Sequence, residues 1–243
     1  MPPTIPALMQ TLRSQDPTAP RLTWYGPGGE RVELSGRVLD NWVAKTANFL
    51  ADELDAVPGT TVCLDLPPHW RSLCWALAGW LAGASLRFGA PTDDGGGTGH
   101  SGAVADIVAT DNPLHSPGAG ITVAVALGAL EMRWAGALPA EAVDYAAEVR
   151  AHGDVYLPFT ETAGADTAVE GAAPAVPFAL LLDGYATPMA AAERVLLRAD
   201  GLESVLRDAL GVWAAGGSVV LVHPEVEITE RLVQSERITL NRA

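Results

Sequence analysis

The segment of this sequence that most suggests chemistry is a glycine-rich stretch from Asp93 to Gly102. Its centre, Gly95-Gly96-Gly97-Thr98-Gly99, has the backbone freedom and the hydroxyl that phosphate-binding loops use. Such a loop needs a strand directly before it and a helix N-terminus directly after it. Here two carboxylates, Asp93 and Asp94, precede the glycines and repel phosphate. The stretch therefore predicts a solvated surface loop.

The end of the same stretch is one residue away from a hydrolase motif. Gly99-His100-Ser101-Gly102-Ala103 matches the G-x-S-x-G nucleophile elbow except at its fifth position. That elbow turns sharply from a strand into a helix, whereas glycines precede this serine. The pattern argues against a Ser-His-Asp hydrolase.

The remaining reactive residue types are too dispersed to form a metal site or a lysine-based site. No two histidines stand four residues apart, and no carboxylate pattern completes a ligand set. Cys63 and Cys74 form no CxxC pair, so we expect two buried free thiols. The chain has a single lysine, Lys45, which lies in an amphipathic stretch far from any glycine-rich turn. We predict no metal, no cofactor and no catalytic residue.

The best candidate binding residues are Asp183, Gly184, Tyr185 and Thr187. The first three follow the apolar run from Val176 to Leu182, which we interpret as a buried strand. Open α/β sheets bind ligands beyond the carboxyl ends of such strands. These residues could therefore line a vestigial cofactor pocket, with Asp65, Pro67 and Trp70 near it. The alternative is a plain turn.

Composition limits the possible partners. The 243 residues are 49% hydrophobic and carry a formal net charge of −14, which predicts a globular, acidic protein. Such a surface repels nucleic acid and anionic membranes, and no apolar run is long enough to span a bilayer. The N-terminus lacks the charged start and apolar core of a signal peptide, so we expect a cytoplasmic location.

Strand and helix patterns alternate along the chain. They predict an α/β fold with a mostly parallel sheet, helices on both faces and a short N-terminal β-hairpin. We expect one domain over 1–243, with a first portion over 1–175 and a second, shortened portion over 176–243. Helices are predicted over 5–15, 35–54, 69–82, 141–150 and 202–215, and strands over 21–25, 31–34, 61–66, 84–88, 105–110, 121–127, 176–182, 194–198 and 218–222.

The predicted helix from about His69 to Ala82 is apolar on two sides. One side carries Trp70, Leu73 and Leu77, and the other carries Trp75 and Trp80. A helix that is apolar all round is buried on both sides. The second side could pack on another layer of the domain or on another subunit, so we predict a possible homodimer through Trp75 and Trp80.

Two segments resemble the N-terminal domain of adenylate-forming enzymes, the group of acyl-CoA synthetases, luciferases and peptide-synthetase adenylation domains. The first runs from Arg21 to Phe88 and includes LSGRVLDNWVAKTANFLADEL and PGTTVCLDLPPHWRSLCWALAGWLAGAS. The second is ERVLLRADGLESVLRDALGVWAAGGSVVLV. Order and spacing agree over most of the chain, which is most similar to a small actinobacterial family of short AMP-binding-like proteins. The resemblance implies the fold of a truncated N-terminal domain.

The interval between these segments departs from the adenylate-forming pattern. That family carries a Ser/Thr/Gly-rich phosphate loop ending in Pro-Lys-Gly, whose amides and hydroxyls hold the ATP phosphates. Here the interval reads VPFALLLDGYATPMAAAERV, with one glycine, one threonine and no lysine. The family's later motifs and C-terminal domain lie beyond the end of this chain. The resemblance therefore implies that adenylation is absent.

Three functions remain open after these comparisons. The first is a non-catalytic binding or interaction module with an unknown protein partner. The second is a partial acyl- or nucleotide-handling enzyme that needs a separate chain. The third is a small-ligand sensor that uses a vestigial acyl or adenine pocket.

Overall fold

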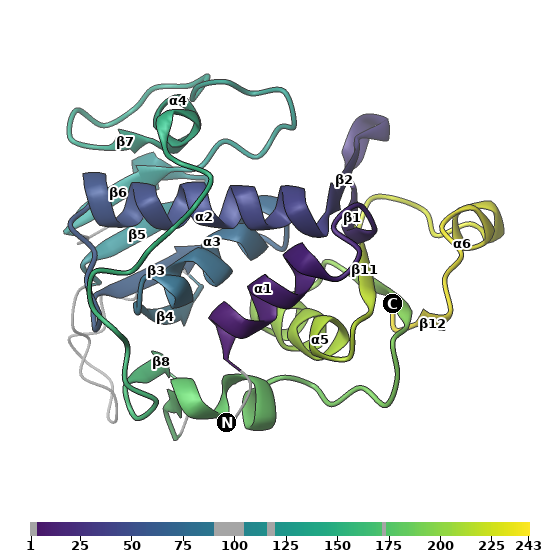
Figure 1. Ribbon diagram of the computed structural model, residues 1–243. Coiled ribbons are helices and arrows are strands. Elements are labelled where there is room, and N and C mark those ends of the chain that lie inside the picture. The colour runs from purple at the N-terminus through teal and green to yellow at the C-terminus, as the bar shows by residue number, and fades with distance from the viewer. Residues whose placement is uncertain (1–3, 90–104, 116–119, 172–173) are drawn as a thin grey trace. The chain divides into compact units, whose positions relative to one another are not determined.

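The structure is a computed structural model that describes residues 4–89, 105–115, 120–171 and 174–243 (Figure 1). The chain divides into two compact units. Unit 1 comprises Met1–Trp42, Pro67–Cys74 and Ala179–Ala243, and unit 2 comprises Val43–Leu66 and Trp75–Phe178. The glycine-rich stretch and the whole elbow-like motif Gly99-His100-Ser101-Gly102-Ala103 lie outside the described residues, and their predictions stay untested.

Unit 1 is built on a five-stranded sheet in the order β12-β10-β11-β1-β2. Its strands are β12 (Leu240–Asn241), β10 (Arg194–Arg198), β11 (Ser218–Val222), β1 (Pro20–Tyr25) and β2 (Arg31–Ser35). All neighbouring pairs are parallel except β1–β2, which is the predicted hairpin. Its connection is a short 3₁₀ turn, Pro27–Gly29, in which Gly28 has a φ of 67°. A left-handed residue of this kind favours glycine.

Helices α1 (Ile5–Ser14) and α5 (Leu202–Ala214) pack together beside this sheet (Figure 1). The Thr4 hydroxyl accepts a hydrogen bond from the Ala7 amide and caps α1. One stripe of α1 is buried, and α5 contacts both β10 and β11. Trp213 near the end of α5 is 1% exposed and donates its indole N–H to the Arg21 carbonyl at 2.9 Å. A short helix, α6 (Glu230–Ser235), follows β11 and completes unit 1.

Unit 2 is built on a seven-stranded sheet in the order β7-β6-β5-β3-β4-β8-β9. Every neighbouring pair is parallel except β8–β9. The strands are β7 (Val143–Asp144), β6 (Ile121–Ala124), β5 (Ile107–Thr110), β3 (Thr61–Asp65), β4 (Ser85–Phe88), β8 (Thr167–Val169) and β9 (Val176–Pro177). The central strands are buried apolar runs, as parallel sheets require.

Three helices share aromatic packing inside unit 2. They are α2 (Gly36–Glu53), α3 (Trp70–Leu81) and the short α4 (Tyr145–Glu148). Residues 43–53 of α2 and 75–81 of α3 belong to this unit. The Phe49 ring lies 6.1 Å from the Trp75 ring and 5.6 Å from the Tyr145 ring. The Thr46 and Tyr145 hydroxyls form a buried hydrogen bond of 2.7 Å.

The predicted dimer contact through Trp75 and Trp80 is wrong. Trp75 is fully buried and packs against Phe49 and Tyr145 of the same unit. Trp80 is 2% exposed and donates its indole N–H to the Ala168 carbonyl at 2.9 Å. The second apolar side of α3 is therefore covered by the chain itself, and neither indole is available to a second subunit.

The predicted α/β class, the N-terminal hairpin and the predominance of parallel strands are confirmed, and the strands form two sheets. The predicted helix over 141–150 is shorter, because the Asp144 carboxylate caps the amides of Ala146 and Ala147 and starts α4 there. The predicted strand over 176–182 reaches only Pro177. Strand β8 lies within a segment that we expected to be loop. Along the described residues, no helix combines the length and apolar character needed to cross a membrane.

Candidate functional site

The four predicted binding residues do not follow a strand. Asp183, Gly184 and Tyr185 lie in a π-helical turn, Leu181–Tyr185, which continues a 3₁₀ turn, Phe178–Leu180. The prediction that they occupy the carboxyl end of a buried strand is therefore wrong. Thr187 lies two residues beyond the turn, and its amide donates to the Arg207 carbonyl at 2.9 Å.

Tyr185 has a structural role in this turn. Its side chain is buried, and its hydroxyl donates to Glu203 Oε1 at 3.2 Å. Arg207 Nε donates to the Tyr185 carbonyl at 2.9 Å, and the guanidinium lies 5.3 Å from the centre of the tyrosine ring. Burial, and then the nearby Glu203 carboxylate, raise the pKa of Tyr185 well above its usual range. The phenol stays protonated and anchors the turn to α5.

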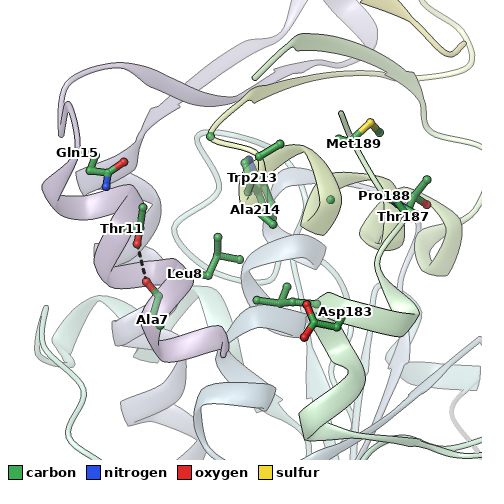
Figure 2. A pocket seen from close by; sticks show the side chains of 14 residues that line it. Ala7, Leu8, Thr11, Gln15, Asp183, Thr187, Pro188, Met189, Trp213 and Ala214 are labelled. Atoms are coloured by element: carbon green, nitrogen blue, oxygen red, sulfur yellow. Dashed lines mark hydrogen bonds between the residues drawn. The ribbon is translucent and has the colours of Figure 1, made fainter. Parts of the chain in front are cut away.

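Asp183 and Thr187, in contrast, line a groove in unit 1 (Figure 2). The groove has a volume of about 630 Å³ and is formed by α1, the segment 182–189 and the C-terminal half of α5. Its floor and walls are mainly apolar and include Leu8, Leu182, Pro188, Met189, Trp213 and Ala214. Polar groups stand among them, namely Thr11, Gln15, Asp183 and Thr187. We define these residues, with the other lining positions on α1 and α5, as the α1–α5 groove.

The groove depends on a close approach between the chain at Thr187 and helix α5. A Cβ added to Gly211 would lie 1.7 Å from the Thr187 carbonyl oxygen, so only glycine allows this contact. The approach brings Thr187, Pro188 and Met189 alongside α5. Nothing in the periodicity of α5 indicated this, although a glycine inside a helical pattern is a known sign of close packing.

Unit 2 contains a second, smaller pocket of about 310 Å³. It lies where β5 and β6 end, and its walls include Asp111, Glu131 and Trp134. Glu131 Oε2 accepts the Gly128 amide at 2.9 Å, and the Trp134 indole donates to the Ala137 carbonyl at 3.1 Å. No residue of this pocket was among the binding residues predicted from the sequence. The rule that ligands bind beyond the carboxyl ends of parallel strands would have indicated it.

A strand and a glycine turn precede the interval that stands in place of the phosphate loop. Strand β8 ends at Val169 and leads into Glu170 and Gly171, where φ is 81°. Glu170 pairs with Arg87, whose Nε lies 2.7 Å from Glu170 Oε2. The residues from Glu170 to Ala175 include no Ser, Thr, Lys or Arg. The turn after β8 therefore holds a carboxylate that is paired with Arg87.

Other titratable groups serve the fold. Lys45 Nζ lies 2.5 Å from the His152 carbonyl and 2.8 Å from Asp154 Oδ1, so it clamps the segment after α4 onto α2. Burial lowers the pKa of His69 to about 3, with Arg71 and His223 adding to the effect, so its imidazole is neutral at pH 7. Its Nδ1 accepts the Arg71 amide at 3.2 Å, which assigns the proton to Nε2.

The two cysteines are buried free thiols, as predicted. Burial raises the pKa of Cys63 to about 11 and that of Cys74 to about 12. Neither thiol is a nucleophile at neutral pH. Over the ranges that the structure describes, no three His, Cys, Asp or Glu side chains gather as a metal site would require.

Solved structures share this fold. The acyl-CoA synthetase of Brucella canis superposes with a TM-score of 0.71 at 19% identity, covering 99% of this chain and 47% of that chain. The N-terminal domain of FACL13 from Mycobacterium tuberculosis gives 0.65 at 15% identity, covering 98% and 62%. The fused adenylation–carrier protein NpsA-ThdA from Klebsiella oxytoca gives 0.67 at 11% identity, covering 99% and 43%. The chain thus spans about half the length of these proteins, and its fold is that of their N-terminal part.

Sequence comparison identifies a relative of nearly the same length. No family model matches the chain. The TIGR03089 family protein of Mycobacterium tuberculosis is 34% identical over 246 residues, which cover 96% of this chain and 95% of that protein. Such identity over nearly the whole of both chains shows common membership, and this chain belongs to the TIGR03089 family.

Proposed function

We propose that this chain is a non-catalytic binding module with the fold of an acyl-CoA synthetase N-terminal part, and that the α1–α5 groove holds a small organic ligand. The groove itself is the observation that carries the proposal. Its volume of about 630 Å³ is within the range of small-molecule sites, which runs from about 300 to about 1,000 Å³. Its apolar floor with a few polar groups is also typical of such sites.

Two further contacts support binding without nucleotide chemistry. The turn after β8 directs the Glu170 carboxylate to Arg87, and Tyr185 is fixed by Glu203 and Arg207. Preorganised donors aimed at developing charge are usually the largest contribution to phosphoryl and acyl transfer. Because Glu170 and Tyr185 bind their own partners in the protein, these groups stabilise the fold rather than a transition state. A cytoplasmic location and an unknown protein partner stay predictions.

The test pairs ligand-observed NMR on a fragment library with a variant that blocks the groove. Ala214 is exposed and lines the groove, so Ala214→Trp fills the space without entering the core. We expect apolar fragments to bind the wild-type chain and to lose their signal with Ala214→Trp. Binding that the variant leaves unchanged would place the site elsewhere.

Pyrophosphate exchange tests whether the chain catalyses adenylation of a carboxylic acid. The purified chain is incubated with ATP, labelled pyrophosphate and a panel of carboxylic acids, and we expect no exchange above the blank. Acid-dependent exchange would show that the chain is an enzyme and would overturn the non-catalytic part of the proposal.

A further inference from the structure

From the polar groups of the α1–α5 groove, we infer that its ligand is an apolar amine, with an ammonium group that binds at Asp183. This inference rests on the proposed function and specifies the ligand class of the same site. Among the described residues, Asp183 is the only ionisable one that lines the groove. Its side chain makes no hydrogen bond or ion pair with the residues that the structure describes, and it is exposed beside the apolar floor (Figure 2).

Among the other polar groups of the groove, several donors are already used within the protein, whereas the Gln15 side-chain amide and the Thr187 hydroxyl can either donate or accept. The Thr11 hydroxyl donates its hydrogen to the Ala7 carbonyl at 2.9 Å, so its oxygen is left to accept (Figure 2). The Trp213 indole donates to the Arg21 carbonyl. Several lining amides already donate to backbone carbonyls within unit 1, at Leu8, Gln15, Thr187, Ala215 and Gly216. A ligand rich in donors suits this arrangement, and an ammonium group supplies three.

The guanidinium of Arg21, which binds the carbonyls of two lining residues, does not offset this preference. Arg21 directs one terminal nitrogen to the Gly216 carbonyl at 2.6 Å and the other to the Gln15 carbonyl at 3.0 Å. These hydrogens hold the backbone at one end of the groove, and Arg21 is not among the lining residues. A carboxylate ligand would instead meet Asp183 and the field of a chain with a net charge of −14. The charge distribution therefore favours a cation over an acid.

The remaining surface of the ligand must be apolar and slender. Leu8, Leu182 and Met189 supply flexible apolar contacts, and Ala214 leaves room beside the helix. Burial of such a body supplies most of the affinity, at roughly 25 cal/mol for each Å² of apolar surface removed from water. The ammonium then supplies orientation and selectivity rather than most of the affinity.

Three probes with one apolar body test the inference by isothermal titration calorimetry: 4-phenylbutylamine, 4-phenylbutanol and 4-phenylbutyrate. We expect the amine to bind most tightly, and the carboxylate to bind about tenfold more weakly or not at all, since it replaces attraction by repulsion. Asp183→Asn should weaken amine binding by about 2- to 5-fold, which is the range of an exposed ion pair. It should also reduce the difference in affinity between the amine and the carboxylate.

Two variants serve as controls. Asp200→Asn removes the same charge from an exposed position outside the groove, and we expect it to leave amine binding unchanged. Ala214→Trp should abolish binding of all three probes. Equal binding of the three probes that Ala214→Trp blocks would overturn the amine inference but keep the groove as a ligand site. The same holds if Asp183→Asn changes amine binding no more than Asp200→Asn does. If no probe binds, or if binding survives Ala214→Trp, the proposed function of the groove is overturned as well.

Discussion

Gly211 is the residue on which the α1–α5 groove most directly depends. A glycine inside a helix costs about 1 kcal/mol relative to alanine, so Gly→Ala normally stabilises. Here the added Cβ would lie 1.7 Å from the Thr187 oxygen, which is a backbone atom that cannot rotate away. Overpacking of this kind costs about 1–3 kcal/mol. The clash and the helix propensity therefore predict effects of opposite sign.

We predict that Gly211→Ala lowers the free energy of unfolding by about 1–3 kcal/mol in urea denaturation. Gly184→Ala is the control, because its added Cβ would meet only Leu180 side-chain atoms at 3.5 and 3.9 Å. That variant should change stability by less than about 0.5 kcal/mol. A stabilising Gly211→Ala would show that Thr187 does not approach α5 as the structure has it.

Glu236 joins three strands of unit 1, β1, β2 and β10, through one carboxylate. Oε1 accepts the Tyr25 hydroxyl at 2.5 Å and Arg31 Nε at 3.0 Å, and Oε2 pairs with Arg194. The same arginine donates to Ser218 on β11 at 3.1 Å. Burial alone would raise the pKa of Glu236, but its bonds to Tyr25, Arg194 and Arg31 outweigh burial and lower it below its ordinary value of 4.5.

A carboxyl whose pKa is lowered by folding stabilises the protein above its unfolded pKa, and that stabilisation is lost as the pH falls through the folded value. We predict that Glu236→Gln costs about 1–3 kcal/mol at pH 7, because Arg194, whose side chain is 17% exposed, loses its charged partner. We also expect the loss of stability between pH 5 and pH 3 to be shallower in the variant.

Denaturant titrations across this pH range measure both the loss of stability at pH 7 and its dependence on pH. Glu33→Gln is the matched control, because Glu33 also binds Arg31, at 2.6 Å, but its side chain is 38% exposed. An exposed pair of this kind contributes about 0–1 kcal/mol. If the free energy of unfolding changes with pH in the same way in the wild type and in Glu236→Gln, the lowered pKa of Glu236 is contradicted.

The helices and strands whose hydrophobic residues follow a single clear period were predictable from the sequence. Helix α2 and the hairpin lie where the pattern placed them, and Ser35 Oγ accepts the Val38 amide at 3.3 Å as a capping residue should. The run from Val176 to Leu182 was not predictable. A short apolar run fits a strand or a helical turn equally well, and Pro177 cannot donate to a ladder. Strand β8 has three residues, which is too short to show a period.

The groove was only partly predictable for a different reason. Asp183 and Thr187 were predicted as binding residues and do line it, whereas Gly184 and Tyr185 have no place in its lining. The lining positions on α1 were missed because α1 lies near the start of the chain, far in sequence from the segment 182–189. Those on α5 were missed because α5 follows that segment after the intervening strand β10. Their proximity follows from tertiary packing around Gly211, which no local pattern encodes.

The buried face of α3 supplies a test at the scale of an element. We predict that Trp80→Phe lowers the free energy of unfolding by about 1–3 kcal/mol, because the Ala168 carbonyl loses a buried donor. We also expect no change in molar mass by light scattering, since Trp80 contacts no second subunit. Trp134→Phe removes a donor from a half-buried indole and should cost less than about 1 kcal/mol. A different molar mass for Trp80→Phe and the wild type would show that Trp80 does contact a second subunit.

At the scale of the whole molecule, the excess of negative charge opposes folding. The chain carries 29 acidic and 15 basic residues, and this surplus repels itself in the compact state. Salt screens such repulsion, because the Debye length falls from about 30 Å at 0.01 M to about 8 Å at 0.15 M. Close buried pairs such as Glu236–Arg194 are screened far less. Added salt should therefore stabilise this protein.

We predict that raising NaCl from 0.01 to 0.15 M at pH 7.5 increases Tm by about 2–4 °C, which corresponds to about 1 kcal/mol for a chain of this size. The control is the same salt step near pH 4.6, the isoelectric point, where net repulsion vanishes and the increase should be much smaller. Equal shifts at both pH values would show that salt acts through preferential exclusion rather than through charge. A fall in Tm at pH 7.5 would mean that exposed pairs such as Lys45–Asp154 outweigh the net charge.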